Sequence, residues 1–415
     1  MTGRRRGRAV AAVLAPLLLV GAAACDSGGK GTKGDKGDEG GKDGSGNAVF
    51  SLPPADQLVA ARTATEGGGT VRFVSTLVYT AKGGGQLTDR TTGSQDFGAD
   101  RAVAVQVQST TGAFPQKAVA ALRGENGRAW RSYSVEGDDV LYRTAKRTWL
   151  RYAASAGDIS KEAALLSKRA GSTTPYGGTL ADAVFGSFPE ARPEKRSDGT
   201  RYYHVMTPAG VFADLVPDGF APRAGSKGEA VPVSLEVELD AQGRLTRAEA
   251  DLSALITDRE THGVTGIKAH LAFSEFGHKA PPSVRPGERT EDASKVLTEL
   301  TKIKPGECAG HDTGLAGFSL LRRVDCSTAH DLRIFGQVRI NETSKERIGL
   351  DGAYKMAQDR CEERYTDAPA AWTAKGRPAG TFYTLGAEGM EILGGGPGDD
   401  ISIVKGDFTC YVKTS

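Results

Sequence analysis

The sequence predicts an α+β fold: a large curved antiparallel sheet (half-barrel) with helices on one face, followed by a smaller disulfide-bonded α+β domain. Three observations support this fold class. Apolar and polar residues alternate in short segments between Val71 and Phe273, which indicates strands. Segments whose apolar residues recur at helical spacing lie at the start of this region and between its predicted strands. Residues 48–288 contain no cysteine, whereas four of the five cysteines lie beyond residue 300, as in an exported disulfide domain that follows a cysteine-free one.

Residues 1–24 have the pattern of an export signal. Four arginines lie within residues 4–8, and an apolar, alanine-rich segment follows at residues 9–24. This segment is too short for a comfortable membrane span. The pattern leaves open whether the chain uses the general secretory route or the twin-arginine route.

Cys25 directly follows the small residues at 21–24, as a cysteine does in the lipobox of bacterial lipoproteins, which this stretch resembles. One departure is Ala22, where that family more often has leucine. The resemblance implies that Cys25 carries acyl chains such as palmitate, and two chains suffice for stable anchoring. We therefore expect the chain at the outer face of the cell membrane, held by membrane lipid through Cys25. The alternative is a secreted protein with an incidental cysteine.

Residues 25–47 are expected to form a tether. The stretch from Asp26 to Asn47 has nine glycines, four lysines, five acidic residues and no aromatic or aliphatic side chain. Ordering such a segment costs entropy and buries nothing in return. A glycine-rich chain of this length spans roughly 25 Å.

The first globular domain is predicted at residues 48–288. Pro53 and Pro54 mark a helix start, and Leu58 follows at helical spacing. Strands are expected around residues 71–79 and 103–107, in a meander over 129–152, in a hairpin that begins at 231–240, and at 267–273. Helical stretches are expected at "SKEAALLSKRA", "TLADAVFGSF" and "TPAGVFADLV".

This order of elements, with "YSVEGDDVLYR", "YYHVMTPAGVFADLV" and "VSLEVELDAQGRLTR", resembles the LppX/LprG family of actinobacterial lipoproteins over about residues 50 to 280. The resemblance implies a half-barrel related to the LolA carrier, whose inner face and helices enclose an apolar cavity for acyl chains. It implies these ligand-binding residues: Phe73, Leu77, Val105, Val107, Tyr133, Leu141, Val233, Leu235, Val237, Leu271 and Phe273. The same residues would form a dry core if the helices pressed flat onto the sheet.

The second domain is predicted at residues 289–415, after a stiff hinge with Pro281, Pro282 and Pro286. "VDCSTAHDLRIFGQV" and "AYKMAQDRCEERY" resemble the septum-formation domain of actinobacterial membrane proteins. Departures are Glu307 and Ala329, where that family has aspartate and often proline. The resemblance implies contacts with envelope proteins.

Cys308, Cys326, Cys361 and Cys410 are expected to form two disulfides, for which three pairings are possible. We favour the local pairing, Cys308 with Cys326 and Cys361 with Cys410. Zinc is the competing interpretation, but the spacing contains no C-x-x-C pair.

Enzymatic, metal, cofactor and nucleic-acid functions are not indicated by the sequence. Basic and acidic residues are interleaved at a net charge of +2, so no basic face stands out. Neither Gly-x-Ser-x-Gly nor His-Glu-x-x-His occurs, and "GGGPGDD" lacks the end of a phosphate loop. His262, His270 and His278 are too far apart in an extended chain to share a metal. We expect a non-enzymatic carrier of acyl-chain ligands; an envelope or septum interaction protein and an unrecognised hydrolase are the alternatives.

Overall fold

The computed structural model describes most of the two predicted domains. The described residues are 46–123, 130–137, 139–145, 148–153, 180–189, 191–216, 220, 230–256, 261–310, 320–345, 348, 350–373, 384–394 and 402–414. The export signal, Cys25, most of the tether and the expected helix "SKEAALLSKRA" lie outside them.

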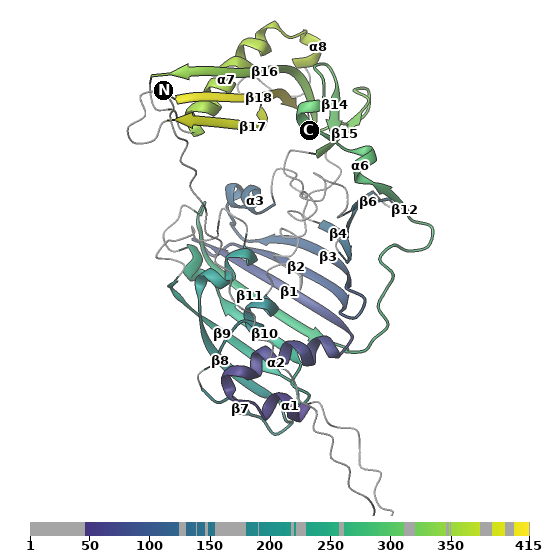
Figure 1. Ribbon diagram of the computed structural model, residues 1–415, viewed down its shortest axis with the longest axis vertical. Helices are drawn as coiled ribbons and strands as arrows, with labels where there is room; N and C mark the ends of the chain where they lie inside the picture. Colours follow the sequence, from purple (N-terminus) through teal and green to yellow (C-terminus); the bar gives the residue numbers. More distant parts are fainter. Residues whose placement is uncertain are drawn as a thin grey trace, which may run out of the picture. The chain divides into compact units, whose positions relative to one another are not determined.

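The first domain is built on a twelve-stranded sheet in the order β12-β6-β5-β4-β3-β2-β1-β11-β10-β9-β8-β7 (Figure 1). The strands are β1 Thr70–Ala81, β2 Gln86–Asp96, β3 Arg101–Thr111, β4 Trp130–Glu136, β5 Asp139–Ala145, β6 Thr148–Tyr152, β7 Glu194–Lys195, β8 Arg201–Pro208, β9 Pro232–Leu239, β10 Leu245–Asp251, β11 Val264–Ser274 and β12 Arg289–Asp292. Strands β1 to β6 pair in succession as antiparallel neighbours, as do strands β7 to β11, and β1 pairs with the distant β11. The predicted α+β class with one large sheet and a smaller one is confirmed.

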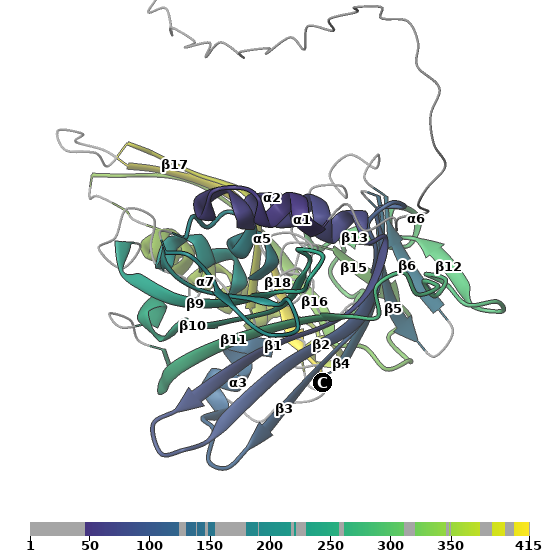
Figure 2. The ribbon, with the colours of Figure 1, turned by 90° about the horizontal axis from the view of Figure 1, so that it is seen from below.

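Helices α1 (Gly46–Phe50), α2 (Pro54–Gly67) and α5 (Leu180–Phe185) lie on one side of strands β9, β10 and β11 (Figure 2). Helix α2 begins where the prolines predict, because Pro53 is its N-cap and Pro54 fits the first turn. The 3-10 helices η1 (Ala209–Leu215) and η3 (Ser253–Ile256) contact each other, and η1 also contacts α5. Helix α3 spans Gln116–Arg123.

The inner face of this sheet, defined here as the face that carries Phe73 and Phe273, holds a continuous apolar cluster. Register places Phe73 opposite Phe273, and Val205 and Ala250 on either side of Leu235. These residues belong to one buried cluster together with Leu58 of α2, Val184 of α5 and Phe212 of η1. The alternation in β9 therefore arises because its apolar side chains face the helices.

The segment after Pro282 is attached to the first sheet. Strand β12 pairs with β6 in parallel. The Glu288 carboxylate accepts hydrogen bonds from Trp149 Nε1 (2.7 Å), Arg143 Nη2 (2.9 Å) and the Arg285 amide (3.0 Å). Burial opposes the charged form of Glu288, but these donors outweigh it, so its pKa lies below the ordinary value.

The second domain contains a six-stranded sheet in the order β13-β15-β14-β16-β18-β17. Its elements are β13 Thr298–Glu299, η4 Leu300–Lys302, β14 Cys308–Gly310, β15 Leu320–Val324, β16 Leu332–Ser344, α7 Leu350–Asp367, α8 Ala370–Thr373, β17 Thr384–Gly394 and β18 Ser402–Lys413. The short helix α6, Ala293–Val296, precedes them and contacts β6 and β12 of the large sheet, and Ala293 belongs to the apolar cluster of that sheet. The sequence "SKVLTELTKI" predicts one short helix, but the structure does not form it, because Leu297 is extended and Thr298–Glu299 pairs with β15 instead.

The preferred disulfide pairing is confirmed. Cys308 is joined to Cys326 and Cys361 to Cys410, with Cα–Cα distances of 5.2 and 5.5 Å. Cys361 lies on α7 and Cys410 on β18, so the second bond fixes the helix against the sheet.

Candidate functional site

A pocket of about 280 Å³ opens on the inner face between α2, α5 and the turn that joins β2 to β3. Its lining residues come from four separate parts of the chain: Arg62, Glu66, Gln95, Phe97, Asp100, Ala181, Asp182, Phe185 and Phe273. The size is close to the lower end of small-molecule sites, which run from about 300 to 1,000 Å³.

The apolar part of the pocket is aromatic. Phe97 and Phe273 meet edge to face, with ring centroids 6.5 Å apart and an interplanar angle of 89°. Phe185 adds a third ring from α5, and both it and Phe273 are buried. Such rings offer a large apolar surface with fixed geometry.

The polar part of the pocket is mainly acidic. Arg62 Nη2 lies 3.3 Å from Asp182 Oδ1 and so joins α2 to α5, while the Arg62 guanidinium stands 5.3 Å from the centre of the Phe185 ring. Glu66 and Asp100 make no ion pair with any residue that the structure describes.

Gln95 places an amide in this pocket. Its side chain is only 6% exposed, and Gln95 Oε1 is buried without a hydrogen-bond partner among the described residues. Buried polar atoms of this kind are rare, because each forfeits the hydrogen bonds it would make in water. This oxygen has almost no accessible surface, so it is a buried polar atom within the pocket wall and not a group that a ligand contacts directly.

The turn between β2 and β3 holds its pocket residues by local hydrogen bonds. Asp96 Oδ1 accepts from the Ala99 amide at 3.1 Å, and the Phe97 amide donates to Gly69 O at 3.2 Å. Asp100 has a φ of 45°, in the left-handed region that aspartate tolerates better than most residues.

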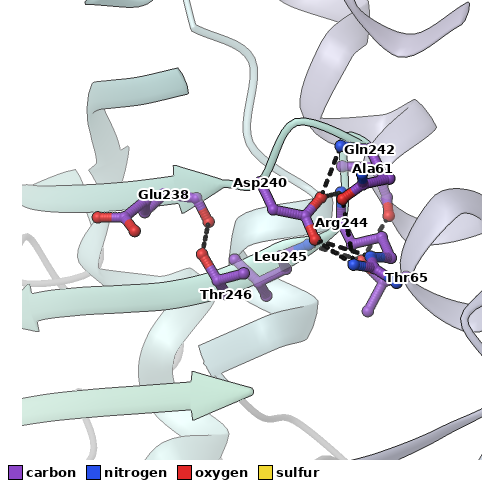
Figure 3. A network of polar contacts seen from close by, with 8 residues as sticks. All are labelled: Ala61, Thr65, Glu238, Asp240, Gln242, Arg244, Leu245 and Thr246. Atoms are coloured by element: carbon purple, nitrogen blue, oxygen red, sulfur yellow. Dashed lines mark hydrogen bonds and ion pairs between the residues drawn. The ribbon is translucent and has the colours of Figure 1, made fainter. Parts of the chain in front are cut away.

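Helix α2 is fastened to the sheet by Thr65, as Figure 3 shows. The Thr65 hydroxyl donates to Ala61 O at 2.7 Å and accepts from the Leu245 amide at 2.9 Å. Thr65 is fully buried. Because Arg62 and Glu66 lie on the same turns of α2, this contact also sets the position of the pocket wall.

Hydrogen bonds also stabilise the turn between β9 and β10, which lies next to the contact between Thr65 and Leu245. Asp240 accepts from the amides of Gln242 and Arg244, each at 2.9 Å, and from Arg244 Nε at 2.7 Å (Figure 3). The Arg244 guanidinium lies 4.2 Å from the centre of the Phe276 ring. The turn that receives the end of α2 is therefore held by its own side chains.

Eight of the eleven predicted ligand-binding residues are buried and belong to the inner-face cluster. They are Phe73, Leu77, Tyr133, Val233, Leu235, Val237, Leu271 and Phe273. Of these, Phe273 also lines the pocket.

Val105, Val107 and Leu141 were expected on the inner face, and this placement is wrong. Val105 and Val107 stand opposite Thr92 and Arg90 in the register, on the outer face, and Val107 is 43% exposed. In the next pair of strands it is Tyr142, not Leu141, that stands opposite Tyr133. Leu141 is buried but outside the inner-face cluster.

Glutamines occupy the inner face of β3 because β2 offers them a partner. Gln106 Nε2 lies 2.8 Å from both oxygens of Asp89, and Gln108 Nε2 lies 2.8 Å from Asp89 Oδ2. All three side chains are buried. Burial, together with the charge of Asp89, raises the pKa of Tyr79 well above its ordinary value. The inner face is therefore polar at these three positions of β2 and β3, which hydrophobicity alone does not predict.

A second hollow, of about 200 Å³, lies on the outer face over β8, β9 and β10. Its charges pair with one another: Arg196 with Glu238 at 3.2 Å and Arg247 with Glu249 at 2.5 Å. Burial, with a hydrogen bond to Glu236, raises the pKa of Tyr202 to about 12. Such an internally paired surface offers a ligand little unsatisfied charge.

The histidines considered in the sequence analysis do not form a common site in the part of the chain that the structure describes. His278 Nε2 lies 2.7 Å from Ser94 Oγ, whereas His270 Nε2 lies 3.8 Å from Glu249. Within the described ranges, no group of three or more His, Cys, Asp or Glu residues is arranged to hold a metal ion. Across the same ranges, every helix is too short or too polar to span a bilayer.

Comparison with known proteins does not assign this pocket. No protein-family model matches the chain, and a search of the curated proteins finds no match either.

Proposed function

We propose that the protein is a membrane-anchored extracytoplasmic lipoprotein whose first domain binds an amphiphile with acyl chains. The observation that carries this proposal is the pocket between α2, α5 and the β2–β3 turn, which combines three phenylalanines with a polar rim. An amphiphile presents both kinds of surface. The likeness to the LppX/LprG half-barrel supports the same ligand class.

The apolar inner face supports the proposal because it continues from the pocket. Phe273 stands beside Phe73, and Leu271 and Leu77 follow along the same two strands. An acyl chain that enters over Phe273 and displaces or parts these side chains would gain about 0.8 kcal/mol per buried methylene.

The place where the expected tether joins the first domain supports a position of the pocket near the membrane. Val49, which follows Gly46, packs against the turn at Gly243. This turn lies at the same end of the sheet as Gln95 and Phe273, because the start of β10 pairs with the end of β11, and β11 pairs with the start of β1, which pairs with the end of β2. The described chain therefore begins at the pocket end of the domain.

Native mass spectrometry tests the proposal on the chain that starts at Asp26, exported to a bacterial periplasm behind a separate cleavable signal peptide and purified from that compartment. We expect bound lipid that is released by organic solvent, and less of it in a Phe97→Ala variant. A Val107→Ala variant is the control, because Val107 is exposed on the outer face. A ligand-free mass for all three proteins, also after incubation with phospholipid vesicles, would reject lipid binding.

The second candidate is an envelope or septum interaction protein with solid cores and no lipid ligand. One observation favours it: Val233, Leu235 and Val237 belong to the same continuous cluster as residues of α5 and η1, as in a dry core. The ligand-free mass just described is the result that this candidate predicts.

A further inference from the structure

The end of strand β8 carries an apolar surface that the first domain leaves exposed. Four large apolar side chains form it: Phe188 (64% exposed), Met206 (56%), Val211 (49%) and Val231 (36%). We propose that this surface, called here the β8 corner, docks on the lipid bilayer to which the protein is anchored. The inference rests on the membrane anchor of the proposed function, but not on a bound ligand.

Contacts at the end of β8 bring these side chains into one surface. Ser187 Oγ lies 3.0 Å from Thr207 Oγ1, which places Phe188 beside the end of this strand. The first amide of η1 donates to Val231 O at 2.8 Å, and Val211 lies in the same 3-10 helix. Strand β8 is next to last in the sheet, and the last strand, β7, has only two residues (Figure 1). The surface therefore lies at a corner of the sheet.

The β8 corner is uncharged. Residues 186–189, 205–212 and 230–235, which build it, include no Asp, Glu, Lys, Arg or His. Contiguous exposed apolar surfaces mark sites of contact with a protein or a membrane. A protein interface normally surrounds its apolar centre with a polar rim. An apolar corner built without charges fits the hydrocarbon of a bilayer better.

The described chain begins on the same edge of the sheet. Helix α1 starts at Gly46, and the Arg201 guanidinium at the start of β8 lies 4.7 Å from the centre of the Phe50 ring at the end of α1. Cys25 precedes Gly46 by 21 positions (46 minus 25). A glycine-rich chain of that length spans roughly 25 Å. The eight residues of β8 extend over about 27 Å, so the whole edge is within reach of a bilayer that holds Cys25.

The β8 corner also adjoins the candidate pocket. Phe185 lines the pocket, and Phe188 follows three residues later. Their Cα atoms are therefore at most about 11 Å apart. Docking at the β8 corner would hold the α5 side of the pocket close to the bilayer from which an amphiphile enters.

Vesicle-bound protein tests the inference. The chain that starts at Asp26 carries a polyhistidine tag in place of the acyl anchor, which holds it on dioleoyl phosphatidylcholine vesicles that contain a nickel-chelating lipid. An environment-sensitive fluorophore is attached at Val211→Cys, because the four other cysteines of this chain are paired in disulfides. We expect a blue shift, and several-fold stronger quenching by doxyl-labelled phosphatidylcholine than for the same fluorophore at Val107→Cys on the outer face.

Two pairs of substitutions make the test specific. Phe188→Ser with Met206→Ser, added to the Val211→Cys chain, should lower the quenching to the level seen at position 107. Leu393→Ser with Val107→Ser removes two other exposed apolar side chains and should leave the quenching unchanged. Added salt, or phosphatidylglycerol in the vesicles, should change neither result, because the β8 corner carries no charge. Thermal melts check that each variant is folded.

The outcomes separate docking from the proposed function. Equal quenching at the two labelled positions, or quenching that survives loss of Phe188 and Met206, would overturn the inference. A blue shift that depends on protein concentration without vesicles would also overturn it, because a second copy of the chain would then cover the β8 corner. The tag replaces the acyl anchor, and lipid binding is measured separately by native mass spectrometry. Docking can therefore fail while the proposed function stands.

Discussion

Replacing Thr65 by valine should loosen helix α2 from the sheet. Valine keeps the shape of threonine but cannot accept the hydrogen bond from the Leu245 amide, which is 2.9 Å long and buried. A buried donor left without a partner costs about 1–3 kcal/mol. Ala61 O loses only an additional bond within the helix. We therefore expect a loss of about 2 kcal/mol in this contact.

Amide hydrogen exchange at Leu245 measures this loss directly, without assuming that two domains unfold in one step. A change of about 2 kcal/mol corresponds to roughly 30-fold faster exchange where the opening is local. Ligand affinity should also fall, because the pocket wall at Arg62 and Glu66 is carried on α2.

Two controls make this prediction specific. Thr65→Ser keeps the hydroxyl and should keep most of the protection at Leu245. Thr246→Val removes the 3.1 Å hydrogen bond that the Thr246 hydroxyl on β10 donates to Glu238 O on β9. This change should leave the Leu245 amide protected. Equal protection at Leu245 in Thr65→Val and in the unmodified protein would refute the reasoning.

Three further predictions concern stability. Leu235→Ala should lower the free energy of unfolding of the first domain by about 2–5 kcal/mol in urea titrations, because Leu235 is fully buried; a loss below about 1 kcal/mol would contradict its place in a packed core. Replacing Cys361 and Cys410 by serine should cost about 4 kcal/mol, since their disulfide closes a loop of 49 positions; unchanged melting of the second domain would count against this. Glu288 has a lowered pKa, so its contribution to stability is present above the ordinary glutamate pKa and disappears as pH falls through the lowered value. Glu288→Gln should therefore make proteolysis at residues 281–288 faster than in the unmodified protein at pH 7, but not at low pH. A variant cleaved at the same rate as the unmodified protein at both pH values would refute this prediction.

The β9 hairpin and the β3 strand show how far the sequence predicts the fold. In β9 every second residue is apolar and its neighbours are polar, so only one orientation buries the apolar set. In β3, Val105 and Val107 alternate with Gln106 and Gln108, and hydrophobicity places the valines inside. The structure does the reverse, because Asp89 on the next strand accepts hydrogen bonds from the Nε2 groups of both glutamines. That partner is a cross-strand contact, which the pattern of one strand does not contain.

The candidate pocket was only partly predictable for a related reason. Phe273 was identified as an inner-face residue, whereas Arg62, Gln95 and Asp182 were not singled out. These residues are brought together when β1 pairs with β11 and α5 packs between α2 and the sheet. The available signal was the end of the β2 pattern at "SQDFGAD", which places a glutamine and a phenylalanine around a turn. The presence of two disulfides was predictable from four cysteines in one block, and of the three possible pairings the structure has the favoured local one.

The pairing of β1 with β11 also has a consequence for biogenesis. Ala81 ends β1 and Val264 begins β11, so one edge of β1 lacks its neighbour until the ribosome has made about 180 more residues. At about 5–20 residues per second this wait lasts roughly 10 to 40 s. During that time a long strand edge with alternating apolar residues is open to pairing with other nascent chains. A chain of this topology has reason to depend on a chaperone that shields the open edge of β1 until β11 has been made.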